Sequence, residues 1–172
     1  VWNADKTVIY YYPADLALGI DFSKVDASSA LNGNTTETEI KLEGVTEIGA
    51  KAFIGFKGLK KIVIPEGVTK IGDYAFAGCS GLTEIVLPST LTEIGEYAFD
   101  GCTSLTAIKL PDTLSVIGEY AFRNAGLKSI VIPSALEILD TGVFQGSALE
   151  SVTIPKTIKF AEAYVFQNSA LK

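Results

Sequence analysis

A short motif recurs through most of this chain at intervals of 22 or 23 residues. Residues 59–81 read LKKIVIPEGVTKIGDYAFAGCSG, and residues 82–104 read LTEIVLPSTLTEIGEYAFDGCTS. Each of five prolines precedes a phenylalanine by eleven positions: Pro65 and Phe76, Pro88 and Phe99, Pro111 and Phe122, Pro133 and Phe144, Pro155 and Phe166. A fixed period of this length predicts a solenoid, because one such unit cannot bury its own hydrophobic face and needs its neighbours to do so.

The repeat divides residues 38–172 into six units. Unit 1 covers residues 38–58 and lacks the proline, and units 2 to 6 open at Leu59, Leu82, Leu105, Leu127 and Leu149. Leu171 stands where a seventh unit would open, so we predict a repeat domain over residues 38–172 whose seventh unit is truncated at the C-terminus. We also expect the chain to be a processed or trimmed piece of a longer protein, since it begins at Val1 without an initiator Met.

Each unit predicts the same local structure. Its opening segment, L-x-x-I-x-[IL], alternates with the period of two that indicates a short strand, and the proline ends that strand because it has no N–H to donate. A second apolar pair follows in V/L-x-x-I-G, and the acidic residue before Tyr-Ala-Phe suggests the start of a short helical turn. The residues expected to point inward are Ile62, Ile64, Ile85, Leu87, Ile108, Leu110, Ile130 and Ile132 from the strands, and Val68, Ile71, Leu91, Ile94, Leu114 and Ile117 from the second segment.

Residues 1–37 do not fit the repeat. The segment VWNADKTVIYYYP alternates and is rich in aromatic residues, which favours one or two short strands, and ASSALNGNTTET reads as a polar loop. We predict that residues 1–37 form an N-terminal cap over the exposed end of the core. The loop contains one glycosylation sequon at Asn34, which matters only in a glycosylating host.

The pattern L-x-x-I-x-[IL]-P-x-x-[LV]-x-x-I-G-x-x-A-F-x-x-C resembles the BspA-like (Treponema-type) leucine-rich repeats of bacterial surface proteins. The resemblance covers residues 38–172 and implies an α/β leucine-rich-repeat solenoid, a right-handed superhelix with a parallel β-sheet on its concave face and short helices or turns on its convex face. The chain departs from the common leucine-rich consensus, because no Asn follows the strand. Gly142 and Val143 replace the Tyr-Ala pair in unit 5, and Phe160 and Ala161 replace Ile-Gly in unit 6, so these last units should stack less regularly.

Composition excludes several functions. The net charge is −6 and the isoelectric point is near 4.7, which argues against a nucleic-acid surface and against binding to an anionic membrane. No apolar run is long enough to cross a bilayer. The chain has no His, so Ser-His-Asp and Cys-His nucleophile pairs and His metal ligands are absent from it. We therefore expect no enzyme activity, no cofactor and no metal site.

Three rows of equivalent residues invite a functional interpretation. Cys79 and Cys102 occupy the same place in adjacent units, where either a disulfide or a pair of buried free thiols would fit, and we favour the thiols. Two longer rows are Tyr74, Tyr97, Tyr120 and Tyr164, and Asp73, Glu96 and Glu119. The tyrosines could stack on sugars or shield the core, and the acids could bind a metal or face solvent. We favour the structural alternative for both rows.

The exposed positions of the strands are the best candidates for binding a partner, since curved solenoids use such surfaces. We predict a partner-binding strip on the concave face formed by Lys61, Val63, Glu84, Val86, Lys109, Val131 and Thr153. Valines around a lysine would give a mixed apolar and cationic contact. The competing explanation is that Val and Thr are present only because they suit strands.

The resemblance implies a non-enzymatic protein-binding or adhesion module of a secreted or surface-anchored bacterial protein, whose export signal or lipoprotein segment has been removed. Its partner would be a host extracellular matrix protein or another cell-surface protein; the oligomeric state is not indicated. One alternative is a structural spacer that displays another domain of a longer chain. A glycoside hydrolase needs two facing carboxylates, whereas the acids here line up in rows along one surface.

Overall fold

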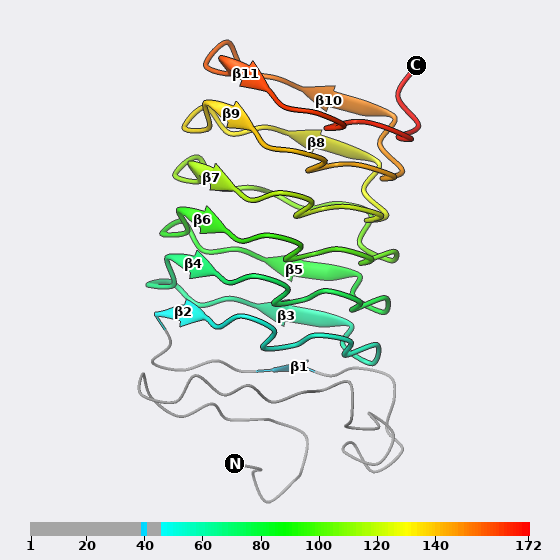
Figure 1. The fold of residues 1–172 in the computed structure, drawn as a ribbon. Helices are drawn as coiled ribbons and strands as arrows, with labels where there is room; N and C mark the ends of the chain where they lie inside the picture. Colours follow the sequence, from blue (N-terminus) through cyan, green and yellow to red (C-terminus); the bar gives the residue numbers. More distant parts are fainter. Residues whose placement is uncertain (1–38, 41–45) are drawn as a thin grey trace, which may run out of the picture.

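The units stack in sequence order along one axis, as the computed structural model shows (Figure 1). The structure describes residues 39–40 and 46–172. The predicted cap over residues 1–37, with its sequon at Asn34, lies outside the described residues. Within the described part, neighbouring units are joined by parallel strands and by columns of turns, so every unit contacts the units before and after it.

The predicted strands line one side of the stack, which we call the first strand face. It contains β1 (Glu39–Ile40), β3 (Lys61–Val63), β5 (Glu84–Val86), β8 (Ser129–Val131) and β10 (Ser151–Thr153). These strands form two parallel sheets, β1–β3–β5 and β8–β10, because residues 106–110 of unit 4 form no strand between them. Equivalent residues of adjacent units lie opposite each other, as Ile62 and Ile85 do. Most of the predicted inward residues are buried, although Leu87 and Ile108 are only partly so.

A second set of short strands, which the sequence analysis did not predict, lines another side of the stack. This second strand face contains β2 (Glu47–Ile48), β4 (Lys70–Ile71), β6 (Glu93–Ile94), β7 (Val116–Ile117), β9 (Ile138–Leu139) and β11 (Phe160–Ala161). Here β2–β4–β6–β7 form one parallel sheet and β9–β11 another. The strands of this face are two residues long, which is too short for an alternating pattern to be recognised.

The prediction of short helices was wrong: the described residues contain no helix, and the Tyr-Ala-Phe segments form a column of turns instead. The backbone at Tyr74, Tyr97 and Tyr120 has φ between 54° and 58°, a left-handed conformation that cannot continue a right-handed helix. Every second N–H group of this segment donates a hydrogen bond to the next unit. Tyr74 N donates to Glu96 O (2.8 Å), and Phe76 N donates to Ala98 O (2.8 Å). The intervening N–H groups bond to the third residue before them within the unit. Because half of the donors join neighbouring units, this segment holds the stack together.

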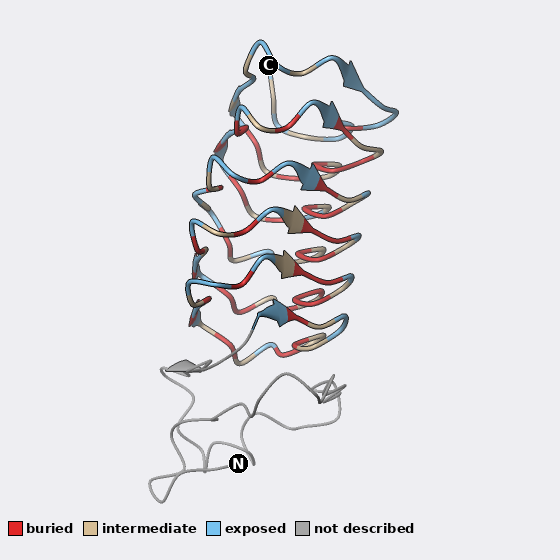
Figure 2. Cartoon of the chain, turned by 90° about the vertical axis from the view of Figure 1, so that its left-hand side faces the viewer, coloured by how far each residue is buried: buried red, intermediate tan, exposed pale blue. Residues whose placement is uncertain are grey.

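A column of phenylalanines fills the interior along the whole described stack. Adjacent rings are nearly parallel, within 11°, and their centroids lie 5.0 to 5.7 Å apart from Phe53 to Phe166. The members are Phe53, Phe76, Phe99, Phe122, Phe144 and Phe166. The inner side of each coil before unit 6 is buried, while the outer turns and most of the last coil are exposed (Figure 2). The last two steps of the column, 5.6 and 5.7 Å, are wider than the earlier ones of 5.0 to 5.2 Å, which agrees with the less regular stacking expected for units 5 and 6.

The strand pairing is interrupted between units 4 and 5. On the second strand face β7 does not pair with β9, whereas the turn column continues across this interface through Tyr120 N to Thr141 O (2.9 Å) and Phe122 N to Val143 O (2.8 Å). We call the unpaired region between residues 115–117 and residues 137–140 the seam. The interruption coincides with the change of unit spacing from 23 to 22 residues between Leu105 and Leu127. Units 4 and 5 are therefore joined at the turn column and by Lys128 N to Thr106 O (3.0 Å), and they are unpaired on the second strand face.

Candidate binding surface

The first half of the predicted binding strip lies on β3 and β5. The register places Lys61 opposite Glu84 and Val63 opposite Val86. Lys61 Nζ lies 2.7 Å from Glu84 Oε1 in an exposed ion pair, which removes much of the net charge at this end of the strip. Val63 and Val86 are 41% and 45% exposed, and together they form a small apolar patch beside that pair.

The second half of the strip lies on β8 and β10, where Val131 is opposite Thr153. Val131 is 64% exposed, the most of the three valines. Lys109 is exposed and lies in unit 4, between the two sheets of the first strand face. The seven predicted residues therefore follow one another unit by unit with exposed side chains, but they do not lie on one continuous sheet.

The tyrosine row is a stack of rings, with little open ring surface. The ring centroids of Tyr74 and Tyr97 are 4.8 Å apart, and those of Tyr97 and Tyr120 are 5.0 Å apart. A sugar that stacks on an aromatic side chain needs an open ring face, and Tyr97 has a ring neighbour in both directions. Tyr164 stands apart from the stack, because unit 5 has Gly142 at this position. The structural interpretation of this row is therefore the better one.

Arg123 completes this column in a way that sequence reasoning missed. Its guanidinium carbon lies 4.9 Å from the ring centroid of Tyr97 and 5.6 Å from that of Tyr120. The same guanidinium donates to both carboxylate oxygens of Asp100, at 3.0 and 2.8 Å. The hydrogen bond with Asp100 also raises the pKa of Arg123. The signal was present in the sequence, since Asp100 and Arg123 are 23 residues apart, which is one unit.

Both cysteines are free and fully buried, as expected for the thiol alternative. Cys79 Sγ donates to Phe53 O at 3.0 Å, and Cys102 Sγ donates to Phe76 O at 3.2 Å. Burial raises the pKa of Cys79 to about 12 and raises that of Cys102 as well. A nucleophilic or metal-binding cysteine needs the thiolate, so these two thiols are suited to packing and not to chemistry.

The acidic row faces solvent and has a structural role at one position. Asp73 Oδ1 accepts a hydrogen bond from Glu96 N at 3.0 Å, which links units 2 and 3. Within residues 46–172 the single polar residue that is buried is Ser147, so no pair of buried carboxylates is found there. No group of three or more acidic or cysteine side chains in the described part is placed to hold a metal ion. The described residues also contain no helical segment that could span a lipid bilayer.

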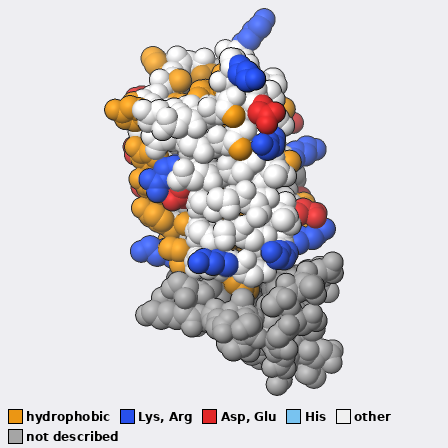
Figure 3. Space-filling view, turned by 90° about the vertical axis from the view of Figure 1, so that its right-hand side faces the viewer, with side chains coloured by type: hydrophobic (Ala, Val, Ile, Leu, Met, Phe, Trp, Pro, Cys, Tyr) orange, Lys and Arg blue, Asp and Glu red, His pale blue; other side chains and the backbone are white. Residues whose placement is uncertain are grey.

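Charges are scattered over the outside of the stack. The side of the molecule that faces right in Figure 1 carries separate Lys and Arg side chains and has hydrophobic side chains gathered along one edge (Figure 3). Several of the lysines and acids pair across units, among them Lys70 with Glu93 (2.7 Å) and Lys159 with Glu137 (2.7 Å). A continuous basic surface of the kind that binds nucleic acid is not seen on that side.

Comparison with known proteins identifies the repeat. The pattern of the BspA type leucine rich repeat region matches residues 46–172 in six copies. A leucine-rich cell surface protein from Faecalibacterium prausnitzii is 27% identical, with a TM-score of 0.71 over 78% of this chain and 39% of that one. The leucine-rich repeat protein of T. pallidum is 25% identical, with a TM-score of 0.64 over 94% and 81% of the two chains.

A third solved structure, a leucine-rich repeat protein from Bacteroides ovatus, is 26% identical, with a TM-score of 0.57 over 75% of this chain. The chain spans 46% of that protein and 39% of the one from F. prausnitzii, which is less than half of either. No curated protein matches the sequence. The similarity is therefore to the repeat fold of bacterial leucine-rich proteins.

Proposed function

Because the chain belongs to the BspA-type leucine-rich repeat family, we propose that it is a non-enzymatic protein-binding module of a bacterial cell-surface protein. Its partner is a protein of the host extracellular matrix or of another cell surface, and it binds along the first strand face. The description of the F. prausnitzii relative as a cell surface protein supports the location. The presence of the same family pattern in every described unit supports an extended, repetitive contact.

The observation that carries this proposal is the row of exposed valines on the first strand face. Val63, Val86 and Val131 are 41%, 45% and 64% exposed, and each lies next to a buried isoleucine of the same strand. Lys109 lies between the second and third of these valines along the stack. Each exposed valine would gain stability from burial against a partner, and removal of a valine side chain from water is worth about 1.5–3 kcal/mol at most. Three such residues in line are suited to an elongated apolar partner surface.

The test is a binding screen against purified host matrix and cell-surface proteins. The variant replaces Val63, Val86 and Val131 by Thr, which keeps the β-branched shape, and Lys109 by Gln. We expect the quadruple variant to keep the thermal midpoint of the wild type and to lose at least about tenfold in affinity for any partner found. The matched control replaces Phe160 by Thr, since this residue is 64% exposed, as Val131 is, and lies on β11 of the second strand face outside the seam.

Binding that is unchanged in the quadruple variant would remove the first strand face as the binding surface. A screen in which the wild-type chain binds no partner would oppose the function itself. Loss of binding in both the quadruple variant and the control would indicate a general effect of surface hydrophobicity, and that outcome also counts against the proposal.

A spacer function is the second candidate, and the continuous phenylalanine column favours it. Six stacked rings and the inter-unit hydrogen bonds of the turn column run through every described interface, including the seam. Such a stack would hold another domain at a fixed distance from a surface. The two functions are separated by replacing the repeat domain in its parent protein with an unrelated solenoid of equal length: a spacer tolerates the exchange, and a binding module does not.

A further inference from the structure

The seam coincides with a change of residue at one position of the repeat. Units 2, 3 and 4 have Gly72, Gly95 and Gly118 directly after the second strand, and Asp140 takes this place in unit 5. A Cβ atom on Gly118 would lie only 2.7 Å from Glu96 N and 2.8 Å from Gly95 C of the preceding unit. At the interface between units 3 and 4, a side chain at this position would therefore force the two backbones to shift.

At Asp140 the hydrogen bonds to the preceding unit are missing. Gly118 N donates to Ile94 O at 2.8 Å, and Gly95 N donates to Ile71 O at 2.8 Å, but the equivalent bond from Asp140 N to Ile117 O is missing. The bonds that would join Glu137 and Ile138 to Ser115 are missing as well, so each of the two strand edges keeps unpaired backbone groups toward the seam. In unit 6 the position holds Glu162, whose N–H donates to Leu139 O at 2.8 Å, and β11 keeps its pairing with β9. A side chain here is thus compatible with pairing at that interface, and the unpaired edges are confined to the seam.

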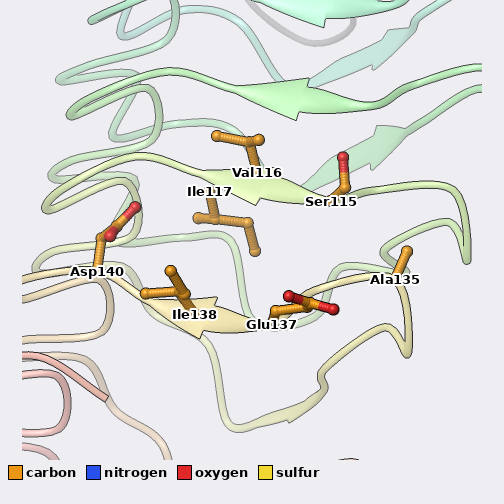
Figure 4. A pocket seen from close by; sticks show the side chains of 7 residues that line it. All are labelled: Ser115, Val116, Ile117, Ala135, Glu137, Ile138 and Asp140. Atoms are coloured by element: carbon orange, nitrogen blue, oxygen red, sulfur yellow. The ribbon is translucent and has the colours of Figure 1, made fainter. Parts of the chain in front are cut away.

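A cavity of about 350 Å³ opens at the seam. Its lining residues are Ser115, Val116, Ile117, Ala135, Glu137, Ile138 and Asp140. Figure 4 places Ile117 and Ile138 between strands β7 and β9, with Asp140 at one end of the space and Ala135 at the other. Val116 and Ile138 are 47% and 43% exposed. The cavity thus combines an apolar floor with unpaired strand edges, and its volume lies within the usual range for ligand sites.

The charge at the seam is negative and only partly balanced. Glu137 pairs with Lys159 at 2.7 Å, but the Asp140 carboxylate has no ion-pair partner among residues 46–172. Burial raises the pKa of Asp140, and Glu119 and Glu162 raise it further because they add negative charge nearby. An occupant that brings a positive charge to this end of the cavity would relieve the repulsion among these three carboxylates.

We propose that the seam is a second binding site, in which an extended basic peptide segment of a partner protein pairs as an added strand with the free edges of β7 and β9. An extended backbone carries alternating donors and acceptors with the spacing that a strand edge requires. Alternate side chains of that peptide pack on Val116 and Ile138, and a Lys or Arg side chain reaches Asp140. This site is distinct from the strip on the first strand face.

The experiment measures binding of three synthetic peptides to the full chain by fluorescence anisotropy. The first peptide has six residues of alternating Lys and Val, with acetylated and amidated ends. The second has Glu in place of Lys, and the third is the Lys-Val peptide with N-methyl groups on alternate backbone nitrogens. We expect the Lys-Val peptide to bind, and the other two to bind at least about tenfold more weakly, because one repels the carboxylates and the other cannot pair with a strand.

Variants of the chain locate the site. Asp140→Gly should let unit 5 approach unit 4, close the seam and abolish binding of the Lys-Val peptide. Glu47→Gln, which removes an exposed carboxylate in unit 1 far from the seam, should leave binding unchanged. Asp140→Asn keeps a side chain of the same size and removes the charge, so we expect about a three- to tenfold loss. If the Asp140→Gly variant does not fold, the Asp140→Asn variant still tests whether the peptide binds at the seam.

Three results would overturn the proposal: no binding of the Lys-Val peptide by the wild type, equal binding of its N-methylated form, or unchanged binding by both Asp140 variants. Equal binding of the N-methylated form would show simple attraction between lysines and an acidic protein. The quadruple variant of the first strand face should bind the Lys-Val peptide as the wild type does, so a failure of this site and a failure of the proposed function can be told apart.

Discussion

Arg123 of unit 4 donates two hydrogen bonds to Asp100 of unit 3, with Nε 3.0 Å from Oδ1 and Nη2 2.8 Å from Oδ2. The carboxylate and the guanidinium are both partly buried, and the guanidinium also lies over the rings of Tyr97 and Tyr120. This geometry fixes two units relative to each other through one side chain. It differs from the other ion pairs of the stack, which are single contacts between well exposed groups.

Replacing Arg123 by Ala should therefore lower the free energy of unfolding by about 1–2 kcal/mol, since both a bidentate pair and a cation–π contact are lost. The control is Lys128→Ala, which removes an exposed pair with Glu150 and should cost no more than about 0.5 kcal/mol. Urea unfolding followed by circular dichroism measures both. Equal effects of the two substitutions would show that Arg123 is one surface charge among others.

The phenylalanine column predicts a strong dependence on position. Phe99 is fully buried between Phe76 and Phe122, so Phe99→Ala should cost about 3–5 kcal/mol and interrupt the stack in its middle. Phe166 is only partly buried and has one ring neighbour, so Phe166→Ala should cost less than half as much. Thermal unfolding of the two variants measures the difference. Similar losses would mean that the rings contribute independently of their neighbours.

The repeat made the stacking and the inward residues predictable, because both recur with the period of the sequence. The helices were predicted wrongly, since nothing in Asp-Tyr-Ala-Phe shows that Tyr74 adopts a positive φ. Turns form in place of a helix because half of the N–H groups bond to the neighbouring unit, and the helix propensity of a short segment does not reflect such bonds. The seam was equally hidden: Asp140 differs from Gly118 by one side chain, and its effect depends on how close the preceding backbone lies.

The glycine position after the second strand gives a direct test of that explanation. Gly118→Ala would place a Cβ 2.7 Å from Glu96 N, so the backbone must shift and the protein should lose about 1–3 kcal/mol. Asp140→Ala is the matched control, because a Cβ is already accommodated there, and it should cost less than about 0.5 kcal/mol. Chemical unfolding measures both. If Gly118→Ala were harmless, close backbone approach could not explain the seam.

Ser147 occupies the position of Cys79 and Cys102 in unit 5, and its buried hydroxyl has no hydrogen-bond partner. Ala125 fills the same position in unit 4, so the site accepts a residue without a polar group. Ser147→Ala should stabilise the protein by about 1 kcal/mol, because a buried unsatisfied hydroxyl is removed. A rise in the thermal midpoint checks this expectation, and a fall would indicate that the hydroxyl has a partner in solution.

The two buried thiols predict how stability depends on alkaline pH. The pKa of Cys79 is raised from its ordinary value of 9.0 to about 12 in the folded protein, and that of Cys102 is raised too. Below pH 9 both states keep the proton and the thiols contribute no pH dependence. Above it the unfolded chain releases the proton while the folded chain retains it, so stability falls as pH rises toward 12. At one pH unit above the unfolded pKa each thiol should cost about 1.4 kcal/mol.

Tyrosines and lysines also titrate in this range, so the measurement is a comparison of slopes. Replacing both Cys79 and Cys102 by Ala removes the thiol contribution and should flatten the fall of the urea midpoint between neutral pH and about pH 10. The lower stability of the variant at neutral pH, which follows from the lost packing, does not enter the slope. Because the folded thiols are protonated, the wild type should also resist alkylation by iodoacetamide until it is unfolded. Equal slopes for wild type and variant, together with rapid labelling of the folded chain, would contradict the burial of these thiols.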